Sequence, residues 1–99
     1  MYKAVILPLA KQDIKDAASW YNDRQLGLGK RFTVHVRNTV HYIRQNPGAV
    51  AIRYDTTRTA LLSKFPYLIH FTVDETKKLV IILGVLSTSR DPKLWKTRG

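Results

Sequence analysis

The sequence predicts a single α+β domain, residues 1–99, in which a two-helix hairpin packs on one face of a mainly antiparallel sheet. A chain of 99 residues has the size of one domain. Its apolar residues change from strand-like to helical spacing near residue 10, and strand-like spacing returns after residue 47. An order of one strand, two helices and then further strands is typical of a sheet whose helices gather on one side.

The first strand and the first helix are separated by a proline. Tyr2–Leu7 is a short apolar run of the kind that forms strands, and we expect Pro8 to end it. Over Ala10–Arg24 apolar side chains recur every three or four residues, which predicts a helix with one buried face. We expect Asp13 in the first turn of this helix, where the helix dipole favours a negative charge.

The segment Arg31–Gln45 fits two structures. Alternating apolar residues at its start suggest a strand, whereas apolar residues at helical spacing continue along its whole length (Phe32, Val36, Val40 and Ile43). Its length and the absence of a turn residue favour a helix. Gly27 and Gly29 predict an inter-helix turn before it, and Asn46-Pro47-Gly48 predicts its end.

The rest of the chain predicts a meander of strands. Val50–Tyr54 and Arg58–Phe65 are the first two, and Tyr67–Val73 alternates apolar and polar side chains like a half-buried strand. Leu79–Leu86 is almost wholly apolar, which predicts a central strand covered on both faces. Within it, Gly84 predicts a bulge or a close backbone approach.

The charge of the chain is strongly positive. Seventeen Lys and Arg residues against 7 Asp and Glu residues give a net charge of +10, and the cations are spread over both halves of the chain. Such a charge attracts anionic partners. The absence of cysteine excludes disulfides and thiolate metal ligands. No apolar run has the length of a membrane span or of a signal peptide, so we expect a soluble, cytoplasmic protein without a membrane partner.

Neither a metal nor a cofactor is expected. His35 and His41 are six residues apart, which places them on different faces of a helix, and His70 is the only other histidine. No serine has the flanking glycines of a nucleophile elbow. The Gly27-Leu28-Gly29 segment lacks the Lys-Ser/Thr pair that ends a phosphate loop, so we interpret it as a turn.

Several short motifs occur along nearly the whole chain. They are A-x-x-D-I-x-x-A-x-x-W-Y (residues 10–21), L-G-L-G-x-x-F (26–32), Q-N-P (45–47), F-P-Y (65–67) and S-R-D-P-x-x-W (89–95). In this order and spacing the sequence resembles the RelE/ParE superfamily of toxins, and it is most similar to the ParE side. The resemblance implies a β-α-α-β-β-β(-β) fold and a co-expressed antitoxin from a type II toxin–antitoxin system.

The superfamily has two activities, and the resemblance implies one or the other. One branch binds and inhibits DNA gyrase. The other cleaves messenger RNA on the ribosome without a metal, which requires cations on the phosphate and groups that move protons. If the chain were such a nuclease, its site residues would be Arg58, Lys64, Tyr67 and Arg90.

Position 87 separates the two branches. Many relatives carry a histidine where this chain has Ser87, and an unassisted serine hydroxyl is a poor acid or base near neutral pH. His70 is predicted on the strand face opposite Tyr67, so it is no evident substitute. We therefore expect a gyrase inhibitor that is not an enzyme, with an acidic antitoxin as its partner; the alternative is a RelE-type endoribonuclease that acts on ribosome-bound mRNA.

The residues expected to bind the target are mostly in the basic C-terminal segment. Arg58 and Arg90 are included, although each can pair at the surface with a nearby aspartate, Asp55 or Asp91. A third hypothesis is a basic nucleic-acid-binding module, which would display aromatic side chains for base stacking, but the candidate aromatics fit a core better. The predicted target-binding set is Arg58, Arg90, Lys93, Trp95, Lys96 and Arg98.

Overall fold

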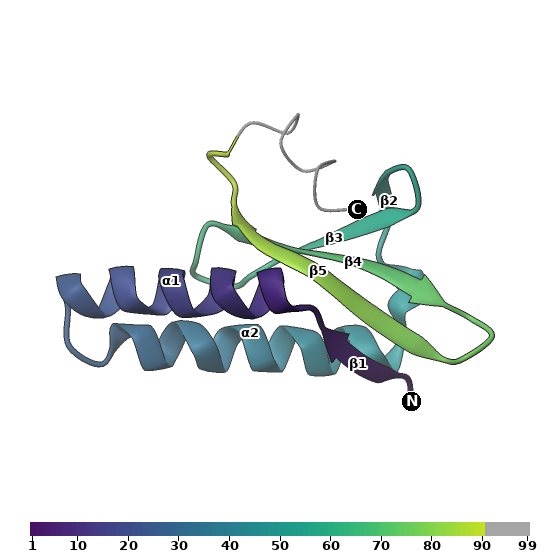
Figure 1. Cartoon of the computed structure of the whole chain (residues 1–99), viewed down its shortest axis with the longest axis horizontal. Helices are drawn as coiled ribbons and strands as arrows, with labels where there is room; N and C mark the ends of the chain where they lie inside the picture. Colours follow the sequence, from purple (N-terminus) through teal and green to yellow (C-terminus); the bar gives the residue numbers. More distant parts are fainter. Residues whose placement is uncertain (91–99) are drawn as a thin grey trace.

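The computed structural model describes residues 1–90, and its elements follow the predicted order (Figure 1). They are β1 (Lys3–Ile6), α1 (Pro8–Arg24), α2 (Leu28–Gln45), the 3-10 helix η1 (Pro47–Ala49), β2 (Ile52–Tyr54), β3 (Thr57–Leu61), β4 (Tyr67–Asp74) and β5 (Leu79–Ser87). The sheet has the strand order β1-β5-β4-β3-β2, and only the β1–β5 pair is parallel. Figure 1 shows α1 and α2 side by side on one face of this sheet. The predicted fold class is confirmed.

α1 begins two residues earlier than the sequence predicted. Pro8 occupies the first turn of the helix, where its fixed φ angle suits the helix and its missing N–H is not needed. Asp13 consequently lies beyond the first turn, and its predicted role at the helix dipole is wrong. Its Oδ2 instead accepts a hydrogen bond from the backbone N–H of Val85 in β5, at 3.0 Å.

The turn between the helices is shorter than predicted. Gly27 adopts a φ angle of 90° and caps α2, which begins at Leu28 and not at Arg31. Gly29 is therefore not a turn residue but lies buried inside α2. It allows the helices to approach closely, since a Cβ atom at this position would lie 2.3 Å from the carbonyl oxygen of Ala18 in α1.

β2 and β3 are shorter than predicted, because a 3-10 helix precedes β2 and a turn follows β3. β2 begins at Ile52, after the 3-10 helix. β3 ends at Leu61, so Phe65 is not a strand residue: the N–H of Leu62 donates to the carbonyl oxygen of Tyr67 at 2.9 Å, and the chain between them forms a turn that buries Phe65.

The bulge predicted at Gly84 is present beside it. His70 of β4 pairs with Gly84 and the next residue, Phe71, pairs with Ile82, so Leu83 is an extra residue in β5. A bulge bends its strand and increases the local twist. Residues on both sides of the bulge are buried, and β5 lies between β1 and β4, as expected of an internal strand.

The core fills the space between the helices and the sheet. At one end it contains four aromatic rings centred on Phe32, whose ring centroid lies 5.0 Å from that of Tyr67, 5.3 Å from Phe65 and 5.5 Å from Tyr21. These contacts hold the Phe65-Pro66-Tyr67 turn against both helices. The remaining core residues include Val36, Val40, Ile43, Ile69, Phe71, Val80, Ile82 and Val85.

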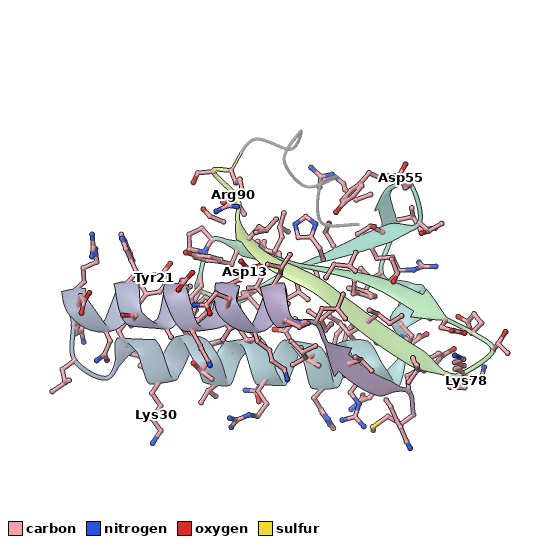
Figure 2. All side chains as sticks on the ribbon, viewed as in Figure 1. Asp13, Tyr21, Lys30, Asp55, Lys78 and Arg90 are labelled. Atoms are coloured by element: carbon pink, nitrogen blue, oxygen red, sulfur yellow. The ribbon has the colours of Figure 1, made fainter. Side chains whose placement is uncertain are left out.

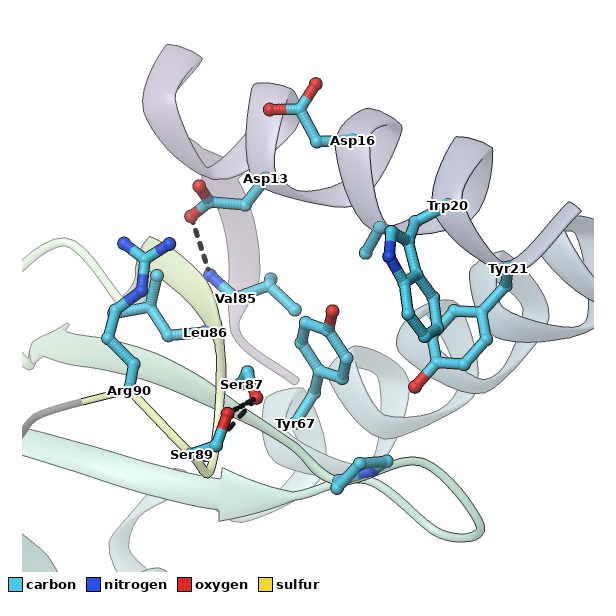
Figure 3. A pocket seen from close by; sticks show the side chains of 12 residues that line it. Asp13, Asp16, Trp20, Tyr21, Tyr67, Val85, Leu86, Ser87, Ser89 and Arg90 are labelled. Atoms are coloured by element: carbon cyan, nitrogen blue, oxygen red, sulfur yellow. Dashed lines mark hydrogen bonds between the residues drawn. The ribbon is translucent and has the colours of Figure 1, made fainter. Parts of the chain in front are cut away.

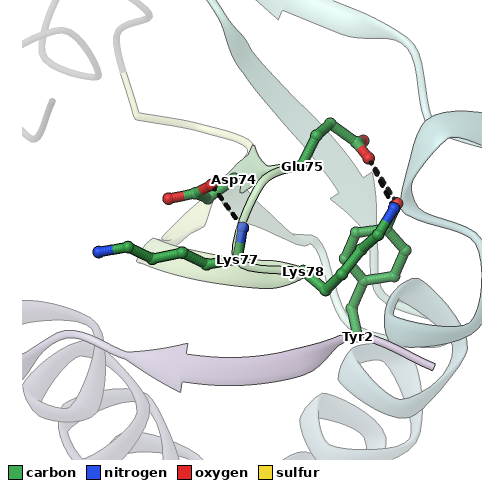
Figure 4. Close-up of polar contacts among 5 residues, drawn as sticks. All are labelled: Tyr2, Asp74, Glu75, Lys77 and Lys78. Atoms are coloured by element: carbon green, nitrogen blue, oxygen red, sulfur yellow. Dashed lines mark hydrogen bonds and ion pairs between the residues drawn. The ribbon is translucent and has the colours of Figure 1, made fainter.

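The β4–β5 hairpin anchors the N-terminal end of the chain (Figure 4). The Tyr2 hydroxyl donates to Glu75 at 2.7 Å, and the ammonium group of Lys78 lies 3.6 Å from the same carboxylate and 5.3 Å from the Tyr2 ring. The N–H of Lys77 donates to Asp74 at 3.0 Å. These contacts are exposed and contribute little stability, but they fix the start of β1.

Neither α1 nor α2 could cross a bilayer, because no stretch of either helix is both long enough and apolar enough.

We predict that Gly29→Ala destabilises the protein despite the better helix propensity of alanine. The new methyl group must displace the Ala18 carbonyl, so we expect a loss of about 1–3 kcal/mol in the free energy of unfolding. Urea denaturation measures it. Gly48→Ala is the control, because its Cβ would meet no atom closer than 4.0 Å; equal effects from both substitutions would contradict the packing argument.

Candidate functional site

A cavity of about 410 Å³ lies between α1, the Phe65-Pro66-Tyr67 turn and the end of β5 (Figure 3). We call it the α1–β5 pocket. In Figure 3, Trp20 and Tyr21 extend from α1, and the ring of Tyr67 stands between them and Ser87. The polar and aromatic side chains that line it are Asp13, Asp16, Trp20, Tyr21, Tyr67, Ser87, Ser89 and Arg90.

The pocket exists because β1 is shorter than β5. β1 has four residues and β5 has nine, and the N–H of Leu7 donates to the carbonyl oxygen of Ile82 where the pairing ends. Past this point the edge of β5 faces α1 with no strand beside it. Asp13 accepts the N–H of Val85 there, which satisfies a backbone donor that a longer β1 would have paired.

Ser87 organises the turn that ends the pocket. Its hydroxyl lies 2.8 Å from the Ser89 hydroxyl and accepts the Ser89 N–H at 3.2 Å. Its carbonyl oxygen accepts the N–H of Arg90 at 3.1 Å, and the N–H of Thr88 donates to Pro66 at 2.9 Å. The Ser87 hydroxyl is therefore engaged in the turn that positions Arg90, and no imidazole lines the pocket to activate it.

The two tyrosines of the pocket remain neutral near physiological pH. Desolvation raises the pKa of Tyr67, and the Asp13 carboxylate raises it further, against the opposing effect of Arg90. Desolvation likewise raises the pKa of Tyr21, with a smaller contribution from Tyr67. Neutral phenols of this kind are poor general bases.

The structure separates the residues of the predicted nuclease set. Tyr67 and Arg90 line the α1–β5 pocket together. Arg58 does not: it pairs with the core residue Phe71, and its guanidinium donates to the carbonyl oxygen of Val50. Lys64 is exposed in the turn before β4, with a φ angle of 69°, and does not line the pocket either. The other predicted target-binding residues, Lys93, Trp95, Lys96 and Arg98, lie outside the described residues.

His70 lies where the strand alternation predicted it. It is fully buried on the sheet face opposite the core residues Ile69 and Phe71, and its Nδ1 lies 3.1 Å from the hydroxyl of Tyr54. It therefore cannot replace the histidine that position 87 lacks. Within residues 1–90 no cluster of three or more His, Asp or Glu side chains could hold a metal ion.

Sequence reasoning missed the α1 wall of the pocket. Asp13, Asp16 and Trp20 follow each other at intervals of three and four residues, so they share one face of α1. Trp20 is 49% exposed, and the Arg24 guanidinium stacks 3.5 Å above its ring. A large aromatic residue on the polar side of a predicted helix was the available signal, because a helix that only covers a core would place it inside.

The pocket is chemically suited to binding and poorly suited to phosphate transfer. Among residues 1–90, Arg90 is the only cation that lines it, whereas Asp13 and Asp16 contribute carboxylates. A phosphodiester in this space would face like charge from α1. Aromatic side chains and an arginine beside a concave surface are instead the groups that dominate protein–protein interfaces.

The sequence matches, over residues 4–92, the family described as ParE toxin of type II toxin-antitoxin system, parDE. Similar solved structures include the chromosomal ParDE toxin–antitoxin system from P. aeruginosa, at 19% identity with a TM-score of 0.77 over 88% of this chain and 96% of that one. The intact E. coli RelBE toxin-antitoxin complex has 17% sequence identity and a TM-score of 0.64, over 91% of this chain and 100% of that one. The isolated E. coli RelE toxin has 16% sequence identity and a TM-score of 0.65, over 98% of this chain and 95% of that one. No curated protein matches the chain.

The raised pKa of Tyr67 predicts a loss of stability at alkaline pH. Above pH 10 the unfolded state releases its tyrosine protons while the folded state retains the Tyr67 proton, so the free energy of unfolding falls as the pH rises toward the folded pKa. We expect Tyr67→Phe to make this decline shallower in urea denaturation between about pH 8 and pH 11. Tyr42→Phe, at a residue that is 65% exposed, is the control. Identical pH slopes for Tyr67→Phe and the wild type would exclude this assignment.

Proposed function

The chain belongs to the ParE toxin family of type II toxin–antitoxin systems, and on that premise we propose that it inhibits DNA gyrase by binding and is neutralised by a cognate acidic antitoxin. Its action requires no chemical step by the toxin itself. Gyrase acts on DNA in the cytoplasm, where we place the protein. The alternative activity of the superfamily, cleavage of ribosome-bound mRNA, is the outcome that the experiment below must distinguish.

The composition of the α1–β5 pocket is the observation that supports inhibition by binding. Cleavage of a phosphodiester by its 2′-hydroxyl needs a group that takes a proton, a group that gives one and cations on the phosphate. The pocket has Ser87 where a histidine would be required, neutral tyrosines and a carboxylate wall, with Arg58 and Lys64 elsewhere. These features favour a contact surface for a protein.

The rim of the pocket contains the side chains that such a contact needs. Trp20, Tyr21 and Arg90 are of the residue types that contribute most of the energy in protein interfaces. Trp20 is half exposed and held by Arg24, so little side-chain entropy is lost when a partner covers it. Lys93, Trp95, Lys96 and Arg98 follow Arg90 in sequence and remain part of the proposed target-binding set.

The antitoxin has a separate candidate site. A groove of about 530 Å³ lies between β1, α1 and α2, which we call the β1–α2 groove. β1 is an edge strand of the described sheet. The floor of the groove is apolar and includes Ile6, Ile14 and Val40, whereas Arg37 and Arg44 supply positive charge. An acidic segment, amphipathic or extended, fits both the apolar floor and the charge.

We predict that Arg90→Ala and Trp20→Ala each weaken inhibition of gyrase supercoiling by purified toxin at least about ten-fold, as expected for anchor residues. Ser87→Ala should change it less than about two-fold, because alanine keeps the carbonyl oxygen that accepts the Arg90 N–H and removes only the hydroxyl; circular dichroism verifies that all variants fold. Codon-specific cleavage of mRNA in a translation reaction, with supercoiling unaffected, would show that the protein is a nuclease.

The groove assignment predicts a local change in hydrogen exchange. The N–H of Lys3 donates to Lys78, just before β5, and the N–H of Leu7, just after β1, donates to Ile82. By alternation the N–H groups of Ala4 and Ile6 point to the open edge. Binding of the co-expressed antitoxin should slow exchange at Ala4 and Ile6 by about ten-fold or more. The amide of Gly27, in the turn at the end of the helices far from β1 (Figure 1), serves as the control. Unchanged exchange along β1 in a stable complex would place the antitoxin elsewhere.

A further inference from the structure

The outer face of α2 contains no acidic residue. Leu28–Gln45 includes Lys30, Arg31, Arg37 and Arg44 but neither Asp nor Glu. The first three of these cations are exposed, whereas Arg44 is partly buried and donates to the carbonyl oxygen of Tyr2. Figure 2 shows Lys30 pointing away from both α1 and the sheet. We call the exposed residues Lys30, Arg31, Val34, Arg37, Asn38 and His41 the α2 face.

The cations of the α2 face have no structural role in the described part of the chain. Within residues 1–90, no ion pair engages Lys30, Arg31 or Arg37. α1 differs, because its exposed surface mixes Lys11 and Lys15 with acidic residues. Like charges gathered on one helix repel each other, and the fold gains no compensating contact from them. An anionic partner would supply that compensation.

The composition of the α2 face favours phosphate over an acidic protein. The large hydrophobic residues that α2 exposes are Val34, at 38%, and Tyr42, at 65%. A protein interface would present an apolar centre with several such anchors. The α2 face instead combines cations with the hydrogen-bonding side chains of Asn38 and His41, which is the composition of surfaces that contact a nucleic-acid backbone.

We propose that the α2 face binds the phosphate backbone of duplex DNA independently of its sequence. Lys30 and Arg37 are separated by about 10 Å along the helix axis, so they reach different phosphates of one strand. The inference rests on the proposed function, because a gyrase inhibitor acts beside the DNA that gyrase holds. The α2 face then adds a contact that the α1–β5 pocket does not provide.

The position of the α2 face also couples DNA binding to neutralisation. Arg37 and His41 belong to the α2 face and also line the β1–α2 groove. A segment that fills this groove covers both side chains. DNA and the antitoxin therefore compete for Arg37 and His41, and the neutralised toxin loses its hold on DNA.

The test measures binding of purified toxin to a fluorescent mixed-sequence DNA duplex, without gyrase, at several salt concentrations. The α2 variant removes three cations of the α2 face by the substitutions Lys30→Gln, Arg31→Gln and Arg37→Gln. The matched control removes three exposed cations elsewhere, by Lys11→Gln, Lys15→Gln and Lys77→Gln. We expect the α2 variant to bind DNA at least about ten-fold more weakly near 0.1 M salt. Its plot of log K against log salt should be shallower by about 2.7, since each of the three phosphate contacts contributes about 0.9 to the slope. The control should lose less than about three-fold.

Three results would overturn the proposal: no binding of the wild type to duplex DNA, equal losses in the two variants, or tighter α2-dependent binding to polyglutamate or to an RNA hairpin. Circular dichroism and urea denaturation establish that both variants fold. Gyrase supercoiling is assayed in parallel. Inhibition of gyrase without DNA binding rejects this inference alone, whereas DNA binding without inhibition of gyrase rejects the proposed function alone.

Discussion

The unequal lengths of β1 and β5 determine where this protein has a pocket. β5 is nine residues long and pairs with β1 only over its first part, from Leu79 to Ile82. Backbone groups on the remaining edge need partners, and Asp13 supplies one by accepting the N–H of Val85. α1 is thereby fixed beside the exposed edge, and the space between them becomes the α1–β5 pocket. The bulge at Leu83 adds local twist just before this edge.

The molecule places its charges unevenly over a strongly basic chain. In the described part of the chain, the pocket combines one arginine with two carboxylates and three large aromatic rings, which suits contact with a protein. The cations of the α2 face are exposed, and α2 itself contains no carboxylate that offsets them. The net charge of +10 therefore does not describe either surface by itself, and each surface has its own electrostatic character.

Hydrophobic spacing was sufficient to predict the element order, the helical state of Arg31–Gln45 and the strand face of His70. Local signals failed where a residue served two elements at once. The sequence pattern predicts Pro8 as the end of a strand, although it also begins α1, and it predicts Gly29 as a turn residue because the contact with Ala18 is tertiary. The pocket could be predicted only in part: Tyr67 and Arg90 were identified, but the contribution of Asp13 depends on a backbone N–H 72 residues away in sequence.

The parallel pairing of β1 with β5 joins the first strand of the chain to the last described one, with Lys3 opposite Leu79. A protein is synthesised from its N-terminus, so β1 has no partner strand until almost the whole domain has left the ribosome. Contacts this distant in sequence also slow folding once the chain is free. The growing polypeptide therefore lacks both the β5 edge and the finished pocket, and its native activity begins only after translation of the domain is complete.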